Sequence, residues 1–133
     1  MTRTMHPSPA RCFLALLVVK LALVVAGTRR IVRVMNARAA APTPHHAASR
    51  SDIERLARRI TIVAALFPGR ARCLEQSLVL WAMLRRSGID ARLRLGVRPH
   101  PFEAHAWVEL DGQAILEDPE KVARFIPLPE PAT

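Results

Sequence analysis

A thiol, an imidazole and a carboxylate occur in this chain in the order and the settings that a cysteine protease requires. Cys73 follows a Pro-Gly turn and begins a segment with helical apolar spacing, and His105 lies within an alternating strand. Asp118 follows an Asp-Gly turn, on the strand expected to return beside that of His105. Together they would supply a nucleophile, a general base and an acid that orients the imidazole.

The Asp-Gly turn predicts which carboxylate lies beside the imidazole. With Asp111 and Gly112 as the two turn residues, counting outward along the hairpin puts Asp118 directly opposite His105. Directly opposed residues share a face of the sheet, with Cβ atoms about 4.5–5.5 Å apart. Glu117 then falls on the other face. It stays the second candidate, because one bulge between the turn and Asp118 would exchange the two carboxylates.

Cys73 is expected at the start of a helix, where partial positive charge and free N–H groups favour a thiolate. Arg70 and Arg72 add positive charge, and the backbone N–H of Cys73 offers one donor of an oxyanion hole. Taken singly, the three residues have commoner roles as a buried cysteine, a structural histidine and a solvated aspartate. A zinc site is the rival use of these side chains, but no close-spaced ligand pair accompanies them. We therefore expect neither metal nor cofactor.

Composition limits the class of protein. The 133 residues suffice for one domain with a limited core. Lys and Arg number 20 against 11 Asp and Glu, which gives a net charge of +9. Two explanations of this charge carry equal weight, an acidic binding partner and an Arg-rich surface that is simply solvated. Aromatic residues are scarce and no nucleic-acid motif is present, so no nucleic-acid partner is expected. Two distant cysteines form no disulfide framework and fit a reducing, cytoplasmic setting.

Residues 1–50 are expected to form N-terminal helices and a linker. The apolar run of residues 12–27 resembles a secretory signal, but Lys20 divides it, and it is shorter than the ~20 residues of a membrane-spanning helix. We therefore predict one or two amphipathic helices over residues 10–39 that cover the domain or dock a partner. A peripheral membrane helix is the second interpretation and a cleaved signal the third. Residues 40–50 read as the linker.

Residues 51–133 are expected to form the catalytic domain, an α+β fold in which a cysteine-bearing helix packs on a small antiparallel sheet. A capping box at Ser51 and Glu54 predicts where the first helix begins, and Gly88 lies just past the end of the second. The Pro-rich tail from residue 127 is expected to fray. The expected elements are helices over residues 52–66 and 73–86, a strand over residues 91–97 and a hairpin over residues 104–118.

The motifs of residues 72–112 resemble the transglutaminase-like B proteins of lasso peptide biosynthesis. The resemblance rests on Arg-Cys-Leu at residues 72–74, on Leu-Gly-Val at residues 95–97, and on His-Ala-Trp-Val-Glu at residues 105–109 followed by Asp-Gly. It covers about residues 51–120. It implies a transglutaminase-like, papain-like peptidase core.

The resemblance also implies a reaction and its residues. Cys73, His105 and Asp118 would correspond to the family's catalytic residues, with Glu117 in place of Asp118 if the spacing differs by one. The reaction would be hydrolysis of one peptide bond, which removes the leader from a ribosomally made lasso precursor. A separate ATP-dependent macrolactam cyclase would then close the ring. Because only about fifty residues precede the capping box, we expect a stand-alone peptidase that relies on a separate leader-recognition protein.

Two other interpretations stay open at this point. Acyl transfer to an amine, the reaction of transglutaminases, would use the same nucleophile. A basic adaptor that binds an acidic peptide, protein or nucleic acid would need no triad at all. For such an adaptor, Cys73→Ala would leave the function intact, and binding to nucleic acid would weaken steeply with salt.

Overall fold

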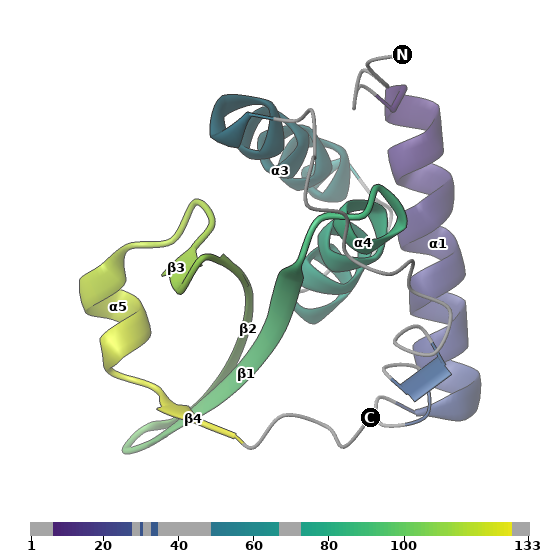
Figure 1. The fold of residues 1–133 in the computed structure, drawn as a ribbon. Helices are drawn as coiled ribbons and strands as arrows, with labels where there is room; N and C mark the ends of the chain where they lie inside the picture. Colours follow the sequence, from purple (N-terminus) through teal and green to yellow (C-terminus); the bar gives the residue numbers. More distant parts are fainter. Residues whose placement is uncertain (1–6, 28–29, 31–32, 35–48, 67–72, 129–133) are drawn as a thin grey trace.

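The computed structural model describes residues 7–27, 30, 33–34, 49–66 and 73–128. In this part of the chain, three helices lie on one side of a curved sheet (Figure 1). The predicted α+β fold, with a cysteine-bearing helix on a small antiparallel sheet, is confirmed. The elements are α1 Pro9–Ala26, α3 Arg50–Ala65, α4 Cys73–Arg86, β1 Ala91–Pro99, β2 Phe102–Leu110, β3 Gln113–Ala114, α5 Pro119–Ala123 and β4 Ile126–Pro127.

Helix α3 begins slightly earlier than predicted. The side chain of Ser49 accepts a hydrogen bond from the Asp52 backbone, and the Asp52 carboxylate accepts one from the Ser49 backbone, each at 3.3 Å. This reciprocal pair is a capping box, so the predicted box at Ser51 and Glu54 is wrong. Glu54 instead lies 3.5 Å from the Arg50 guanidinium, an ion pair between successive helical turns.

The helices bury one continuous apolar core. Helix α1 packs against α3 and α4, and α4 packs against β1 and β2. The helix predicted over residues 52–66 is confirmed apart from its start, and α1 adds three of its described residues to the same core. The buried side chains are Ile53, Leu56, Ala57, Ile60, Val63 and Ala64 of α3 and Cys12, Leu16 and Val19 of α1.

Parts of the N-terminal prediction lie outside the described residues. These are most of residues 28–39, the last part of the helices predicted over residues 10–39, and residues 40–48 of the linker predicted over residues 40–50. The turn before Cys73 and the tail beyond residue 128 also lie outside the described residues. None of the helices that the structure describes is long and apolar enough to cross a membrane.

The sheet has the strand order β3-β2-β1-β4, and every neighbouring pair is antiparallel. The predicted two-residue turn is confirmed, since Asp111 and Gly112 have φ values of 52° and 78° and Leu110 pairs with Gln113. Positive φ at both positions is what a twisted hairpin requires of its turn.

The returning strand is far shorter than predicted. The ladder of β3 ends at Ala114, and one further bond joins the Ile115 N–H to the Val108 carbonyl at 2.9 Å. Leu116 then takes the left-handed conformation, with φ of 51°, which turns the chain out of the ladder. The prediction that the ladder continues to Asp118 is therefore wrong.

Candidate active site

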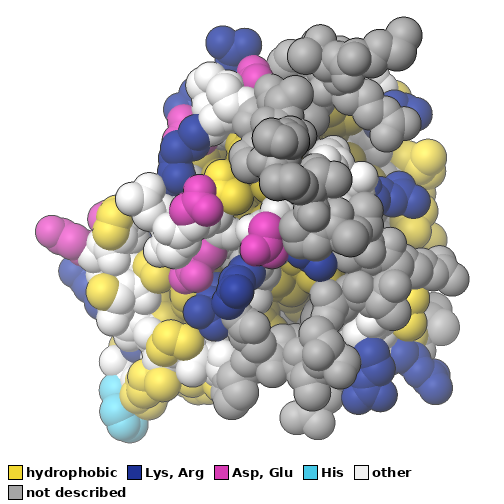
Figure 2. Space-filling view, in the orientation of Figure 1, with side chains coloured by type: hydrophobic (Ala, Val, Ile, Leu, Met, Phe, Trp, Pro, Cys, Tyr) yellow, Lys and Arg dark blue, Asp and Glu magenta, His cyan; other side chains and the backbone are white. Residues whose placement is uncertain are grey.

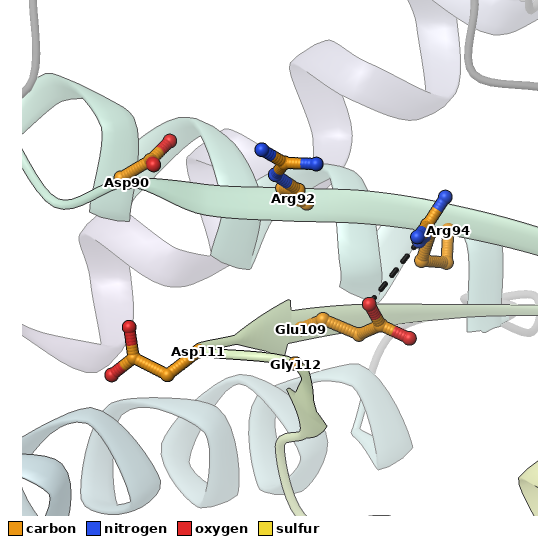
Figure 3. Close-up of a pocket in the computed structure, with 6 residues that line it drawn as sticks. All are labelled: Asp90, Arg92, Arg94, Glu109, Asp111 and Gly112. Atoms are coloured by element: carbon orange, nitrogen blue, oxygen red, sulfur yellow. Dashed lines mark hydrogen bonds and ion pairs between the residues drawn. The ribbon is translucent and has the colours of Figure 1, made fainter.

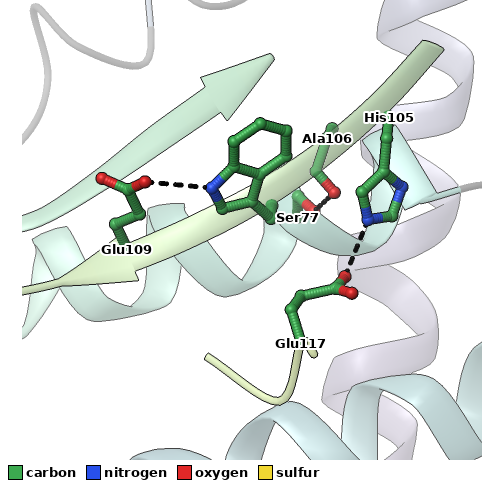
Figure 4. A network of polar contacts seen from close by, with 6 residues as sticks. Ser77, His105, Ala106, Glu109 and Glu117 are labelled. Carbon is green, nitrogen blue, oxygen red and sulfur yellow. Dashed lines mark hydrogen bonds and ion pairs between the residues drawn. The ribbon is translucent and has the colours of Figure 1, made fainter. Parts of the chain in front are cut away.

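His105 is hydrogen-bonded to a carboxylate that the sequence ranked second. Its Nε2 lies 2.9 Å from Oε1 of Glu117, and the two side chains are 11% and 22% exposed (Figure 4). Because the chain leaves the ladder at Leu116, Glu117 turns back toward the imidazole. The distortion thus has the effect expected of a bulge in this hairpin.

Asp118 does not lie beside the imidazole as the hairpin register predicted. It is the N-cap of α5, where its side chain accepts a hydrogen bond from the Glu120 backbone at 3.0 Å. The sequence carried a signal for this role, because an aspartate followed by Pro119 and Glu120 is typical of the start of a helix. This local preference for a helix competes with continued strand pairing.

Two aromatic rings enclose the imidazole of His105. The ring centroid of Trp107 lies 5.9 Å away in a stacked arrangement, and that of Phe125 lies 5.3 Å away and tilted. The residue opposite His105 on β1 is Gly96. A Cβ there would lie 2.8 Å from the Trp107 ring and 2.9 Å from Cβ of Phe125, so only glycine lets both rings close around the imidazole.

Strand alternation places His105 and Trp107 on one face of β2, whereas the contributions of Gly96 and Phe125 were not predicted. Glycine within a strand is a known sign of close approach, so Gly96 was the available signal. Phe125 lies on the segment between α5 and β4, and it reaches the site through pairing of β4 with β1. A contact that depends on pairing between distant strands cannot be predicted from a local sequence pattern.

Polar contacts continue from Trp107 along the same face. The Trp107 indole N–H donates to Glu109 at 3.1 Å, and the Arg94 guanidinium donates to the other carboxylate oxygen at 3.1 Å. Glu109 thereby fixes the indole that flanks the imidazole. It also lines a polar pocket of about 290 Å³ at the far end of the hairpin, shown in Figure 3; the other lining residues are Asp90, Arg92, Arg94, Asp111 and Gly112.

Two hydrogen bonds set the direction of α4 along β2. The hydroxyl of Ser77 donates to the Ala106 carbonyl at 3.0 Å, and the Trp81 indole donates to the Ala91 carbonyl at 3.1 Å, near the other end of the hairpin. Cys73 precedes Ser77 by one turn, about 6 Å along the axis. The first turn of α4 therefore extends from the level of Ala106 toward the Phe102 end of β2, past the level of His105.

Cys73 is the first residue of α4, and its thiol is free and half-buried. Backbone N–H groups in the first turn of a helix lack intrahelical partners, which suits the binding of negative charge. The predicted neighbours Arg70 and Arg72 lie outside the described residues.

The other thiol is unsuited to chemistry. Cys12 is fully buried in the helical core. Burial raises the pKa of the Cys12 thiol, and the positive charge of Arg59 only partly opposes this. A thiol that resists ionisation and has no contact with solvent is a poor nucleophile.

Metal-ligating side chains are not gathered at one place in the described part of the chain. There, no group of three or more His, Cys, Asp and Glu side chains lies close enough together to hold a metal ion.

Comparison with known proteins supplies the family. The family model for the transglutaminase-like superfamily matches residues 14–130. The microcin J25-processing protein McjB of Escherichia coli is 40% identical over 60 residues, which span 45% of this chain and 29% of McjB. No solved structure gives a significant match. The two matches confirm the resemblance to a transglutaminase-like processing protein, and the chain belongs to the transglutaminase-like superfamily.

Proposed function

We propose that this chain is a cysteine peptidase that removes the leader from a ribosomally made lasso peptide precursor. The observation that carries the proposal is the 2.9 Å hydrogen bond between His105 and Glu117, beside two aromatic rings. His105 lies in the part of β2 toward which the first turn of α4, with Cys73, extends. Membership of the transglutaminase-like superfamily and similarity to a microcin-processing protein support the same activity.

The hydrogen bond supports distinct roles for the two imidazole nitrogens. A carboxylate can only accept, so Nε2 of His105 carries the proton that it donates to Glu117. Nδ1 is then the free base that takes the proton from the Cys73 thiol. Asp118, which caps α5, keeps a structural role in this scheme.

The reaction proceeds in two steps. The Cys73 sulfur attacks the scissile carbonyl, the amide C–N bond breaks, and His105 passes its proton to the departing amine of the core peptide. The leader is left on Cys73 as a thioester. Water, deprotonated by His105, then attacks the thioester carbonyl, which releases the leader as a carboxylic acid and restores the thiol.

The proposal includes partners and a compartment. A separate leader-recognition protein would present the precursor, and an ATP-dependent macrolactam cyclase would use the freed amine. The charge of +9 offers complementary surface to an acidic leader or partner. The thiols of Cys12 and Cys73 are both free, which suits the reducing cytoplasm. We expect slow cleavage by this chain alone; equal rates with and without the recognition protein would contradict that expectation.

Mass spectrometry of precursor products tests the proposal. The chain, a leader-recognition partner and a lasso precursor are incubated together, beside Cys73→Ala and the matched control Cys12→Ala. We expect one cut at the leader–core junction with the wild type and with Cys12→Ala, and none with Cys73→Ala. Cutting by Cys73→Ala at the wild-type rate would overturn the assignment. Added amines that end up on the leader carboxylate would indicate acyl transfer in place of hydrolysis.

A further inference from the structure

Among the described residues, no strand pairs with the part of β2 next to His105 along the edge that faces away from β1. We propose that an extended segment of the substrate peptide pairs with this edge at Ala104, as an added antiparallel strand. This inference rests on the proposed peptidase function, and it names how that site would hold its substrate.

Hydrogen bonds on both sides of the hairpin show which backbone groups face outward. The Leu128 N–H donates to the Leu95 carbonyl at 2.8 Å, so Leu95 faces β4 and its pairing partner Ala106 faces away from β1. Two further hydrogen bonds are consistent with this orientation. The Ala106 carbonyl accepts from the Ser77 hydroxyl, and the Val108 carbonyl accepts from the Ile115 N–H. Backbone groups point to the same edge at every second residue, so the N–H and C=O of Ala104 face outward too.

Among the described residues, the outward backbone groups of β2 that have partners end at Ala106. Strand β3 pairs with the last two residues of β2, and Leu116 then turns the chain away. Ser77 occupies the Ala106 carbonyl. Among the described residues, no hydrogen-bond partner meets the outward N–H and C=O of Ala104, and the residue is exposed. The distortion that brings Glu117 to His105 therefore also ends the pairing of the described chain with β2 before Ala104.

An unpaired strand edge is a template for an extended peptide. A substrate residue opposite Ala104 would accept a hydrogen bond from its N–H and donate one to its C=O. The added strand would run about 4.8 Å from β2. Because His105 is the next residue along β2, such pairing carries the peptide backbone past the imidazole.

The surroundings favour an apolar segment of that peptide. Val97 is directly opposite both Ala104 and Ile126, so these residues share one face of the sheet, and Phe102 shares it by alternation. Phe102 is 75% exposed and Ile126 58% exposed. Figure 2 shows hydrophobic side chains gathered at the lower left of the molecule, where β1, β2 and β4 end. Apolar side chains of the bound strand would cover them.

The test removes one backbone donor and keeps the fold. Ala104→Pro deletes the outward N–H, at an edge position where proline is tolerated, and Ala104→Val keeps it as the matched control. The probe is a synthetic peptide of about 12 residues that spans the leader–core junction of the lasso precursor. We expect Ala104→Pro to raise KM roughly tenfold with little change in kcat, as loss of about one hydrogen bond implies, and Ala104→Val to match the wild type.

N-methylation of the probe supplies the second measurement. Methyl groups are placed on successive backbone nitrogens, and binding to Cys73→Ala and to the double variant Cys73→Ala with Ala104→Pro is measured by calorimetry. We expect one backbone position of the peptide at which methylation weakens binding to Cys73→Ala. The same methyl group should have a much smaller effect on binding to the double variant, which lacks the Ala104 N–H. Sedimentation of both proteins shows whether a second copy of the chain occupies the edge instead.

Several results would overturn the inference. Equal KM values for the wild type and Ala104→Pro would do so, as would an equal rise in KM for Ala104→Val. So would the absence of any methylated position whose effect on binding depends on Ala104. A dimer of the chain that Ala104→Pro dissociates would show that a second copy occupies the edge. Thermal melting checks that each variant is folded. Failure of the peptidase proposal is separate, because it appears as cleavage that survives Cys73→Ala, while the binding measurement uses that inactive variant.

Discussion

Replacing Glu117 with Gln should slow cleavage far more than replacing Asp118 with Asn. The Glu117 carboxylate lies 2.9 Å from His105 Nε2, and both side chains are largely shielded from water. A hydrogen bond to a charged group contributes about 1.5–3 kcal/mol. If Glu117→Gln removes that much stabilisation of the imidazolium in the transition state, kcat falls roughly 10- to 150-fold, since 1.4 kcal/mol is about tenfold.

Asp118→Asn is the matched control. Asparagine caps helices about as well as aspartate, so α5 should keep its start and the chain its stability. We expect a cleavage rate within about twofold of the wild type, because the Asp118 side chain bonds to the Glu120 backbone and not to His105. The assay is single-turnover cleavage of the precursor with the recognition partner present, read by mass spectrometry, beside thermal melts of each variant.

The opposite pattern would refute this reasoning. If Asp118→Asn lost activity more than tenfold while Glu117→Gln retained it, the strand would continue past Ala114 in solution and Asp118 would face His105. If Glu117→Gln lowered the melting temperature enough to account for its lower cleavage rate, the Glu117 carboxylate would have a structural role instead.

Three further predictions concern stability. Gly96→Ala should lower the free energy of unfolding by roughly 1–3 kcal/mol in urea titration, because its Cβ would meet Trp107 and Phe125 at 2.8–2.9 Å; unchanged stability would mean that the rings move freely. Trp81→Phe should cost about 1–2 kcal/mol in the same titration, since it leaves a buried carbonyl without its donor. Because burial raises the pKa of Cys12 above its ordinary value of 9.0, the unfolded thiol ionises first. Stability should therefore fall as pH rises from about 9 through the raised pKa, and Cys12→Ala should abolish that component.

The sequence predicted the parts of the fold that depend on local pattern. The helix over residues 52–66 apart from its start, the span of α4 and the turn at Asp111 and Gly112 were confirmed. Helical spacing and the chemistry of a positive-φ turn depend on residues that are close in the sequence. The register next to that turn was also right, as Leu110 pairs with Gln113.

The carboxylate beside the imidazole could not be predicted in the same way. Counting the register outward from the turn assumes that the strand continues. Leu116 ends it by taking a left-handed conformation, which a leucine rarely adopts and which its sequence context does not predict. The helix signal at Asp118 pointed against continued pairing, but weighing it required knowing where α5 docks. Phe125 is a second example, because its contact with His105 depends on pairing between strands far apart in sequence.

The most direct test of the account is detection of the leader on the thiol of Cys73. The chain, the recognition partner and the precursor are mixed, quenched in acid within the first turnover, and analysed by intact-protein mass spectrometry with peptide mapping. We predict a protein species heavier by the leader acyl group, attached at Cys73, absent from Cys73→Ala and present in Cys12→Ala. Leader release at the normal rate with no adduct at any quench time, or an adduct at another residue, would contradict the account.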